Sequence, residues 1–387
     1  MDSKTKYMKK RDMIIFIMSC LALCLIIGSC KKQNEKLNAS IYTSENLKDE
    51  SKDYTYFLEQ KVDSILTTLT LEERVGESLM PSLPSSDNEG VLSRLKKWIE
   101  DYHIGGIVLL SGDINSASLI AQIGSEAQVP LFIAIDAEWG LGMRLHDAPV
   151  YQKNGNIGKE AGEVKLYDYG KEIAVESHKI GINMILGPVV DVVTDSKGVI
   201  GKRSFGSDPA LVSDYGIAYA KGLESGGMIS VAKHFPGHGS TYNDSHIGVA
   251  ILNKNITALD TIDLKPFKEY INAGLSGVMA GHIQVKSLDP EGRAASVSED
   301  ILTSLLREEL GFKGLIITDA FDMGGAKGFS ASEAIKAGAD LILCPYDVEK
   351  EYKELISNVK NGNLPIEIIN DRCRRILFYK VLFGIIK

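Results

Sequence analysis

The segment from Lys233 to His246, KHFPGHGSTYNDSH, has the densest set of chemically reactive side chains in the sequence. Asp244 and His246 are two residues apart, and in a bent loop that spacing lets the carboxylate accept a hydrogen bond from the imidazole. Such a contact stabilises the imidazolium and raises the pKa of the histidine. A histidine in this state can donate a proton and later take it back, so the pair is a candidate general acid and base.

Two other interpretations of this segment are open. Its side chains include four of metal-binding type, His234, His238, His246 and Asp244, although no HExxH or paired-cysteine pattern accompanies them. The segment would otherwise be a structural loop, because buried histidines are often hydrogen-bonded packing. We expect no metal and no cofactor, since GxGxxG, GxxxxGKS/T and GxSxG motifs are also missing from the sequence.

Polar side chains follow most of the short apolar runs in the sequence, at the points where strands would end. They are Ser111, Asp136, Asp191, Lys233 with His234, His282 and Asp319. In a parallel barrel all strands end on one face, and active sites form there. We therefore expect these residues to meet at one site, although they are far apart in the sequence.

The apolar runs indicate the fold class. They span residues 106–110, 131–135, 184–186, 228–232, 277–280, 315–317 and 340–343. Their lack of polar alternation favours parallel strands that are buried on both faces, and helical segments separate them. With an eighth strand in addition, this α/β pattern predicts a single (β/α)8 TIM-like barrel. The alternative is an open, doubly wound sheet.

Local signals predict several of the helices. Residues 57–69 have an apolar stripe at helical spacing, and Thr70 begins a capping-box pattern for a second helix. Ser298 is a candidate cap for a helix that ends before Gly311. The same order of helix, glycine and strand is predicted again for residues 331–337, Gly338 and residues 340–343.

The N-terminus resembles the export signal of a bacterial lipoprotein. Basic residues 9–11 precede an apolar run from Met13 to Gly28, which is short for a membrane span. The run ends in small residues before Cys30, as in a lipobox, where the cysteine is acylated and becomes the first mature residue. The alternative is a signal anchor or a weak membrane helix.

Three regions follow from these signals. We expect residues 1–29 to be a lipoprotein signal peptide, residues 30–56 a flexible polar tether and residues 57–387 the barrel. The tether has few aliphatic side chains, so it cannot bury a core. The protein would be exported and anchored in a membrane through Cys30, on a periplasmic or cell-surface face.

Composition narrows the range of partners. The chain has 387 residues, 44% of them apolar and 24% charged, as in ordinary globular proteins. Its formal net charge of −8 repels phosphate backbones, so we expect no nucleic-acid partner. Two of the five cysteines, Cys344 and Cys373, lie in the body of the chain, too few for a disulfide framework or a zinc site. We expect a monomer.

Several segments resemble glycoside hydrolase family 3, in its β-N-acetylglucosaminidase branch. They are KHFPGHGSTYNDSH, DAEWGLGMR (136–144), GPVVDV with VIGKRSFGSDP (187–209) and TDAFDM (318–323), in the family's order. The resemblance extends from about Leu71 to the C-terminus. It implies a barrel that removes terminal β-linked N-acetylglucosamine from peptidoglycan fragments or chitin-like oligosaccharides by a retaining double displacement.

The resemblance also implies residue roles. Asp319 would be the nucleophile that forms a glycosyl-enzyme intermediate, and His246 would be the acid/base, paired with Asp244. The positions that bind the hydroxyls and the N-acetyl group of the sugar are matched by Asp136, Arg144, Arg203, Lys233 and His234. Asp191 and His282 match motif positions with a structural role.

Two residues depart from the family pattern. Trp139 stands where the branch usually has glycine, and its ring would either shape the sugar pocket or pack in the core. Phe321 stands where leucine is common, a change that we expect to affect packing only. Asp319 also suits a helix N-cap, and Asp322 is a lesser candidate for the nucleophile.

Four alternative functions are open. They are a β-glucosidase or a phosphorylase of the same family, a metal-dependent barrel hydrolase, and a non-catalytic lipoprotein that binds wall fragments. Phosphorolysis fits the chemistry because a neutral histidine tolerates an incoming phosphate better than a carboxylate does.

Overall fold

The strands of the fold form where the sequence has its short apolar runs. The computed structural model describes residues 44–157, 161–194, 198–241 and 248–387. Seven strands form one parallel sheet in the spatial order β10-β8-β6-β5-β4-β3-β2. Their bounds are β2 Ser82–Ser85, β3 Gly106–Gly112, β4 Phe132–Ile135, β5 Met184–Ile185, β6 Ile229–Phe235, β8 Gly277–Ala280 and β10 Leu315–Thr318. Every residue of β4, β6, β8 and β10 is buried, as expected for parallel strands covered on both faces.

Parallel pairing continues beyond the two edges of this sheet. Strand β1 (Leu79–Met80) pairs with β11 (Ile342–Leu343), and a bridge joins Leu341 to Ile317 of β10. Pro81 separates β1 from β2, because proline has no N–H to give to a ladder. The sheet is therefore curled: the residue directly before β11 bridges to the edge strand β10, and the partner of β11, β1, directly precedes the opposite edge strand β2 in the sequence.

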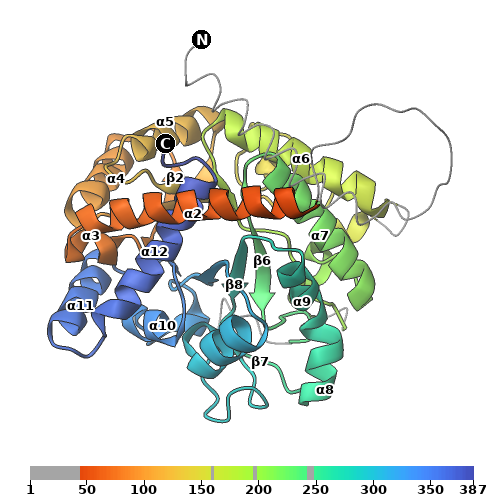
Figure 1. Ribbon diagram of the computed structural model, residues 1–387. Coiled ribbons are helices and arrows are strands. Elements are labelled where there is room, and N and C mark those ends of the chain that lie inside the picture. The colour runs from red at the N-terminus through yellow and green to blue at the C-terminus, as the bar shows by residue number, and fades with distance from the viewer. Residues whose placement is uncertain (1–43, 158–160, 195–197, 242–247) are drawn as a thin grey trace. The chain divides into compact units, whose positions relative to one another are not determined.

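Helices alternate with the strands and lie outside the sheet (Figure 1). The helices are α2 Ser44–Thr68, α3 Leu71–Gly76, α4 Glu89–Tyr102, α5 Ile114–Ser125, α6 Gly162–Lys179, α7 Pro209–Ser225, α8 Ile256–Ala258, α9 Lys265–Asn272, α10 Ala331–Ala337, α11 Val348–Lys360 and α12 Ile366–Leu382. Shorter or wider helical turns are η1 Leu141–Met143, η2 Asn154–Asn156, η3 Gly201–Arg203, η4 Leu259–Asp263, η5 Ala295–Val297, η6 Asp300–Glu309 and η7 Gly324–Ala326. A separate pair of strands is β7 Ala250–Ile251 with β9 Ile283–Gln284. The predicted α/β class is confirmed, with a curled parallel sheet at its centre.

The helix signals in the sequence are largely confirmed. Thr70 caps α3 with a complete capping box, and α10 has the predicted bounds. The Ser298 hydroxyl accepts a hydrogen bond from the Ile301 N–H (3.3 Å) at the start of η6. Helix α2 begins at Ser44 rather than near Phe57, so residues 44–56, which were expected in the tether, are part of this helix.

The core has two layers, which the alternation of side chains along the strands produces. In β4, Phe132 and Ala134 join the cluster enclosed by the curled sheet, whereas Ile133 and Ile135 join the cluster under the helices. Successive side chains of a strand point to opposite faces, so one short strand supplies both layers.

A buried ion pair joins the first and last parts of the described chain. The Glu77 carboxylate, just after α3, accepts a hydrogen bond from Nζ of Lys380 in α12 at 2.7 Å, and both side chains are buried. Burial raises the pKa of Glu77, and the ammonium of Lys380 acts against that rise. The two partners are 303 positions apart in the sequence.

Glu224, at the end of α7, is a half-buried residue whose carboxyl group connects the starts of two strands. It accepts hydrogen bonds from the Ser230 hydroxyl (2.6 Å) and the Ser276 backbone N–H (2.9 Å), which lie at the starts of β6 and β8. Burial raises its pKa from 4.5 to about 7, although the hydrogen bonds act in the opposite direction. The protonated form of Glu224 therefore stabilises the fold. This contribution is fully present when the pH is below the ordinary glutamate pKa of 4.5, and it is lost as the pH rises through about 7.

We expect Glu224→Gln to weaken the pH dependence of stability. The amide keeps an acceptor oxygen for both hydrogen bonds but cannot ionise. Between about pH 5 and about pH 7.5 the free energy of unfolding should therefore fall more in the wild type than in the variant. Urea unfolding at both pH values measures this difference, and equal pH slopes in the two proteins would contradict it.

The predictions for the N-terminus fall largely outside the described residues. Residues 1–43 include the predicted signal peptide, Cys30 and most of the tether, and none of them is described. Among the helices of the described part, none is long and apolar enough to cross a membrane.

Candidate active site

A pocket of about 410 Å³ lies at the ends of the strands and contains most of the predicted site residues. Asp136 follows β4, Lys233 and His234 are near the end of β6, and Asp319 follows β10. The polar residues that line the pocket include Asp136, Glu138, Arg144, Arg203, Lys233, His234, His238, Asp319 and Asp322. The expected meeting of strand-end side chains is thus observed, except for Ser111, Asp191 and His282, which are not among the lining residues.

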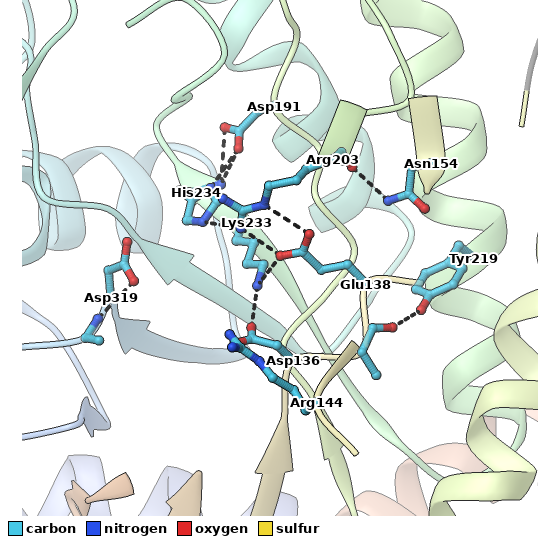
Figure 2. Close-up of polar contacts among 12 residues, drawn as sticks. Asp136, Glu138, Arg144, Asn154, Asp191, Arg203, Tyr219, Lys233, His234 and Asp319 are labelled. Carbon is cyan, nitrogen blue, oxygen red and sulfur yellow. Dashed lines mark hydrogen bonds and ion pairs between the residues drawn. The ribbon is translucent and has the colours of Figure 1, made fainter. Parts of the chain in front are cut away.

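Asp136 forms ion pairs with two cations. Its carboxylate accepts a hydrogen bond from Nζ of Lys233 at 2.7 Å, and a second one from Arg144 (Figure 2). Burial alone would raise the pKa of Asp136, but the charges of Lys233 and Arg144 outweigh it and lower the pKa below the ordinary value. This carboxylate is therefore ionised and can accept hydrogen bonds from sugar hydroxyls.

Glu138 is a site residue that the sequence analysis missed. Its carboxylate is fully buried, 2.8 Å from Nζ of Lys233, and it accepts two hydrogen bonds from Arg203 at 2.7 and 3.0 Å (Figure 2). Its pKa is lowered because these two cations overcome the effect of burial. Its position two residues after Asp136, at the same strand end, is the only sequence signal that could have found it.

Lys233 is thus shared between two carboxylates. Its side chain is buried, and burial alone would lower its pKa, but Asp136 and Glu138 raise it. The ammonium is therefore charged and fixed in position at the floor of the pocket. Arg203 also belongs to this network. Its guanidinium makes a bidentate contact with Glu138, and its backbone carbonyl accepts a hydrogen bond from Asn154 (2.9 Å).

Asp191 orients two histidines that line the pocket, His234 and His238. It is fully buried and accepts hydrogen bonds from the N–H groups of His234 (3.2 Å) and His238 (2.6 Å). Its Oδ2 is 2.7 Å from Nδ1 of His234, and because a carboxylate only accepts, Nδ1 carries the proton. The other ring nitrogen, Nε2, faces Arg203 at 3.5 Å. The structural role expected for Asp191 is consistent with these contacts.

Asp319 lies at the wall of the pocket with little exposure to solvent. Burial would raise its pKa, but the imidazoles of His234 and His282, the Ala320 N–H and Lys233 together lower it. The Ala320 N–H donates to Oδ1 at 2.9 Å, which leaves the second carboxylate oxygen, Oδ2, outside that contact. Asp319 is therefore an ionised carboxylate at the wall of the pocket.

His282 fixes the backbone next to Asp319. Its Nε2 is 3.0 Å from the carbonyl oxygen of Ala320, so Nε2 must be the donor. Nδ1 is 2.8 Å from the Ser296 hydroxyl, and burial lowers the pKa of the ring. The imidazole therefore fixes the peptide between Ala320 and Phe321, which follows the peptide whose N–H binds Asp319.

The remaining predicted residues have different outcomes. Trp139 lines the pocket rather than packing in the core, and Nζ of Lys153 lies 4.9 Å from its ring centroid. Asp322 lines the same pocket. Asp244 and His246 lie outside the described residues, so their pairing stays a prediction. Within the described ranges, no cluster of three or more His, Cys, Asp or Glu side chains could bind a metal ion.

The fold is that of a known domain family, as comparison with known proteins shows. Residues 70–378 match the family model of the glycosyl hydrolase family 3 N terminal domain. This match covers most of the chain, and the chain belongs to glycoside hydrolase family 3.

Relatives and solved structures agree with this family. β-Hexosaminidase A of Pseudoalteromonas piscicida is 34% identical over 321 residues, which are 72% of this chain and 54% of that protein. The β-hexosaminidase of Nitrosomonas eutropha is 33% identical, over 66% of this chain and 77% of its own length. A family 3 β-N-acetylglucosaminidase structure from a Paenibacillus species has 31% identity and a TM-score of 0.76, covering 82% of this chain and 63% of that one. The chain thus spans about half the length of the first of these relatives.

Proposed function

We propose that the chain hydrolyses terminal β-linked N-acetylglucosamine with retention of the anomeric configuration. The main support is Asp319, a carboxylate kept ionised at a strand end, in a pocket whose other polar side chains can bind sugar hydroxyls. The names of the relatives, β-hexosaminidases and a β-N-acetylglucosaminidase, favour the same activity. Peptidoglycan fragments and chitin-like oligosaccharides are the proposed substrate classes.

In the proposed mechanism Asp319 and His246 act in two displacements. The ion-paired Asp136, Arg144 and Lys233 would bind the hydroxyls of the terminal sugar. The carboxylate of Asp319 then attacks the anomeric carbon while His246, paired with Asp244, donates a proton to the departing glycosidic oxygen. In the second displacement water attacks the same carbon, gives a proton to His246 and releases the carboxylate.

The assignment of His246 and Asp244 is supported by the sequence motif and by the described residue His238. His238 lines the pocket and lies only a few positions before the undescribed residues 242–247. The chain therefore leaves the described region close to the proposed reaction site. A histidine on this segment would serve as the acid that a retaining glycosidase needs.

We also propose the finer points of architecture and location. The pairing of β1 with β11, together with the bridge from Leu341 to Ile317, supports an eight-stranded barrel that closes through residues 79–85. The lipobox-like sequence before Cys30 supports export and a lipid anchor in a membrane, and we propose a monomeric enzyme.

Activity on simple glycosides tests the proposal. We expect the full chain to release nitrophenol from nitrophenyl N-acetyl-β-glucosaminide far faster than from nitrophenyl β-glucoside. Added phosphate should leave the rate unchanged, and the product should be free N-acetylglucosamine. A sugar 1-phosphate as product would indicate a phosphorylase, preference for the glucoside would indicate a glucosidase, and sugar binding without turnover would indicate a binding protein.

A further inference from the structure

Trp139 is an aromatic side chain of the pocket to which the proposed mechanism gives no role. It lines the pocket, is half-buried and belongs to neither hydrophobic core cluster of the described chain. The other of the two tryptophans in the sequence, Trp98 in α4, packs against the core instead. Covering a large apolar ring removes its surface from water, so a ligand that packs on Trp139 gains free energy of binding.

The ring of Trp139 is held in place by a second chain segment, residues 149–154. The Tyr151 N–H donates to the Trp139 carbonyl at 3.3 Å, and a Cβ on Gly140 would lie 2.3 Å from the Tyr151 ring. Nζ of Lys153 lies over the indole, 4.9 Å from the ring centroid, and this cation–π contact covers one face. Lys153 is exposed and does not line the pocket, whereas Trp139 does. The indole therefore stands between the ammonium and the pocket.

Trp139 and Asp319 lie on opposite sides of the pocket. Asp319 follows β10 and Trp139 follows β4, and β5, β6 and β8 separate these two strands in the curled sheet. Figure 2 shows the same separation between Asp319 and the pair Asp136 and Glu138, which come from the strand end that carries Trp139. Trp139 is half-buried whereas Glu138 and Lys233 are buried, so Trp139 lies nearer the mouth of the pocket.

This placement coincides with the path of a leaving group. In a double displacement the nucleophile attacks the face of the sugar that is opposite to the leaving group. With Asp319 as the nucleophile, the aglycone therefore departs on the side of the pocket that carries Trp139. The C–H groups of a pyranose form apolar faces, and such a face can pack on an indole with burial of both surfaces. A second sugar unit is thus an aglycone that fits this wall.

We propose that Trp139 is the binding platform for the second sugar unit of a β-linked oligosaccharide, with its ring fixed by Lys153. The platform favours substrates whose leaving group is a pyranose over substrates whose leaving group is a small alcohol. This inference rests on the proposed function, in which Asp319 attacks the terminal sugar. It makes Trp139 a specificity-determining residue of the same pocket.

The first test compares substrates that have the same terminal sugar and different leaving groups. The leaving group of chitobiose is a pyranose, and that of methyl N-acetyl-β-glucosaminide is methanol. For Trp139→Ala we expect kcat/KM, which reports the first displacement, to fall by about 10-fold with chitobiose and by less than about threefold with the methyl glycoside. Trp139→Phe should recover most of the loss, because phenylalanine also offers an aromatic face.

Lys153→Met is a milder variant for the case in which Trp139→Ala does not fold. It leaves the indole in the chain and removes the cation that fixes it, so we expect a loss of about two- to threefold, selective for chitobiose.

The matched control is Trp98→Phe. Trp98 also has a cation near its ring, with the guanidinium carbon of Arg94 at 6.0 Å from the centroid. Trp98 does not line the pocket, so kcat/KM should equal the wild-type value with both substrates.

Tryptophan fluorescence gives a second test that needs no turnover. Because the sequence has two tryptophans, Trp98→Phe leaves Trp139 as the single emitter. With Asp319→Asn added to prevent cleavage, saturating chitobiose should change this emission far more than the saturating methyl glycoside does. The same titration with Trp139→Phe in place of Trp98→Phe should leave the emission of Trp98 unchanged.

Three results would overturn the platform. They are an equal loss of kcat/KM with both substrates in a folded Trp139→Ala, a wild-type kcat/KM with chitobiose in that variant, and chitobiose binding by calorimetry that leaves the Trp139 emission unchanged. A wild-type chain that cleaves neither substrate, although chitobiose changes the Trp139 emission, would instead refute the proposed function. The two failures are therefore distinguishable.

Discussion

Asp319→Asn should lower kcat/KM for nitrophenyl N-acetyl-β-glucosaminide by on the order of 1,000-fold or more. The amide has the same shape as the carboxylate and can still accept the Ala320 N–H, so the pocket should remain folded. It has no negative charge and cannot form a stable glycosyl ester, so the first displacement loses its nucleophile. Initial rates across substrate concentrations, with the unfolding midpoint of the variant measured alongside, test this expectation.

Asp322→Asn is the matched control for this variant. Asp322 also lines the pocket and has the same side chain, three residues further along the chain. Its replacement should cost far less activity, and a reversed order of the two losses would transfer the nucleophile role to Asp322. A second check uses Asp319→Gly with azide, which should give a glycosyl azide of the opposite anomeric configuration.

Lys233→Met should destabilise the fold by about 3–5 kcal/mol at neutral pH, besides abolishing most activity. Lys233 is the shared partner of Asp136 and Glu138, which are both buried and both have lowered pKa values. Methionine fills much of the same volume but leaves two buried carboxylates with one cation fewer. Urea unfolding of both proteins at about pH 7.5 measures the loss.

The pH dependence of this deficit distinguishes a charge effect from a packing effect. In the variant the two carboxyl groups take up protons at a higher pH than in the wild type, so the deficit should shrink as the pH falls. A deficit that is independent of pH would point to packing alone. Lys97→Met is the control, because Lys97 pairs with Asp101 at the surface and its loss should hardly change stability.

The sequence was a good guide to the strands and to which strand ends carry the polar groups. The predicted strand at residues 277–280 has the observed bounds, because a short apolar run between turns has few alternatives. Strands β1 and β2 were missed because Pro81 divides them into pieces too short to form a pattern. Strands β7 and β9 have two residues each and depend on each other for pairing.

The sequence predicted which residues form the site better than it predicted the hydrogen bonds and ion pairs between them. Asp136, Lys233 and Asp319 could be found because each comes at the end of an apolar run. The bond from Asp191 to His234 spans 43 positions, and spacing alone gives no sign of it. Glu138 was missed because its importance comes from two cations that only the fold brings to it. Such contacts depend on tertiary geometry, which local patterns do not encode.

The link between Glu77 and Lys380 has a consequence for the order in which a newly made chain can fold. Of the described strands, β1 is synthesised first; it pairs with β11, and the carboxylate of Glu77 beside it pairs with an ammonium from α12. Contacts at such separation form slowly, because a long loop must close before they stabilise anything. Strand β1 therefore has no partner until β11 has been synthesised, and any pause before α12 leaves Glu77 without its cation.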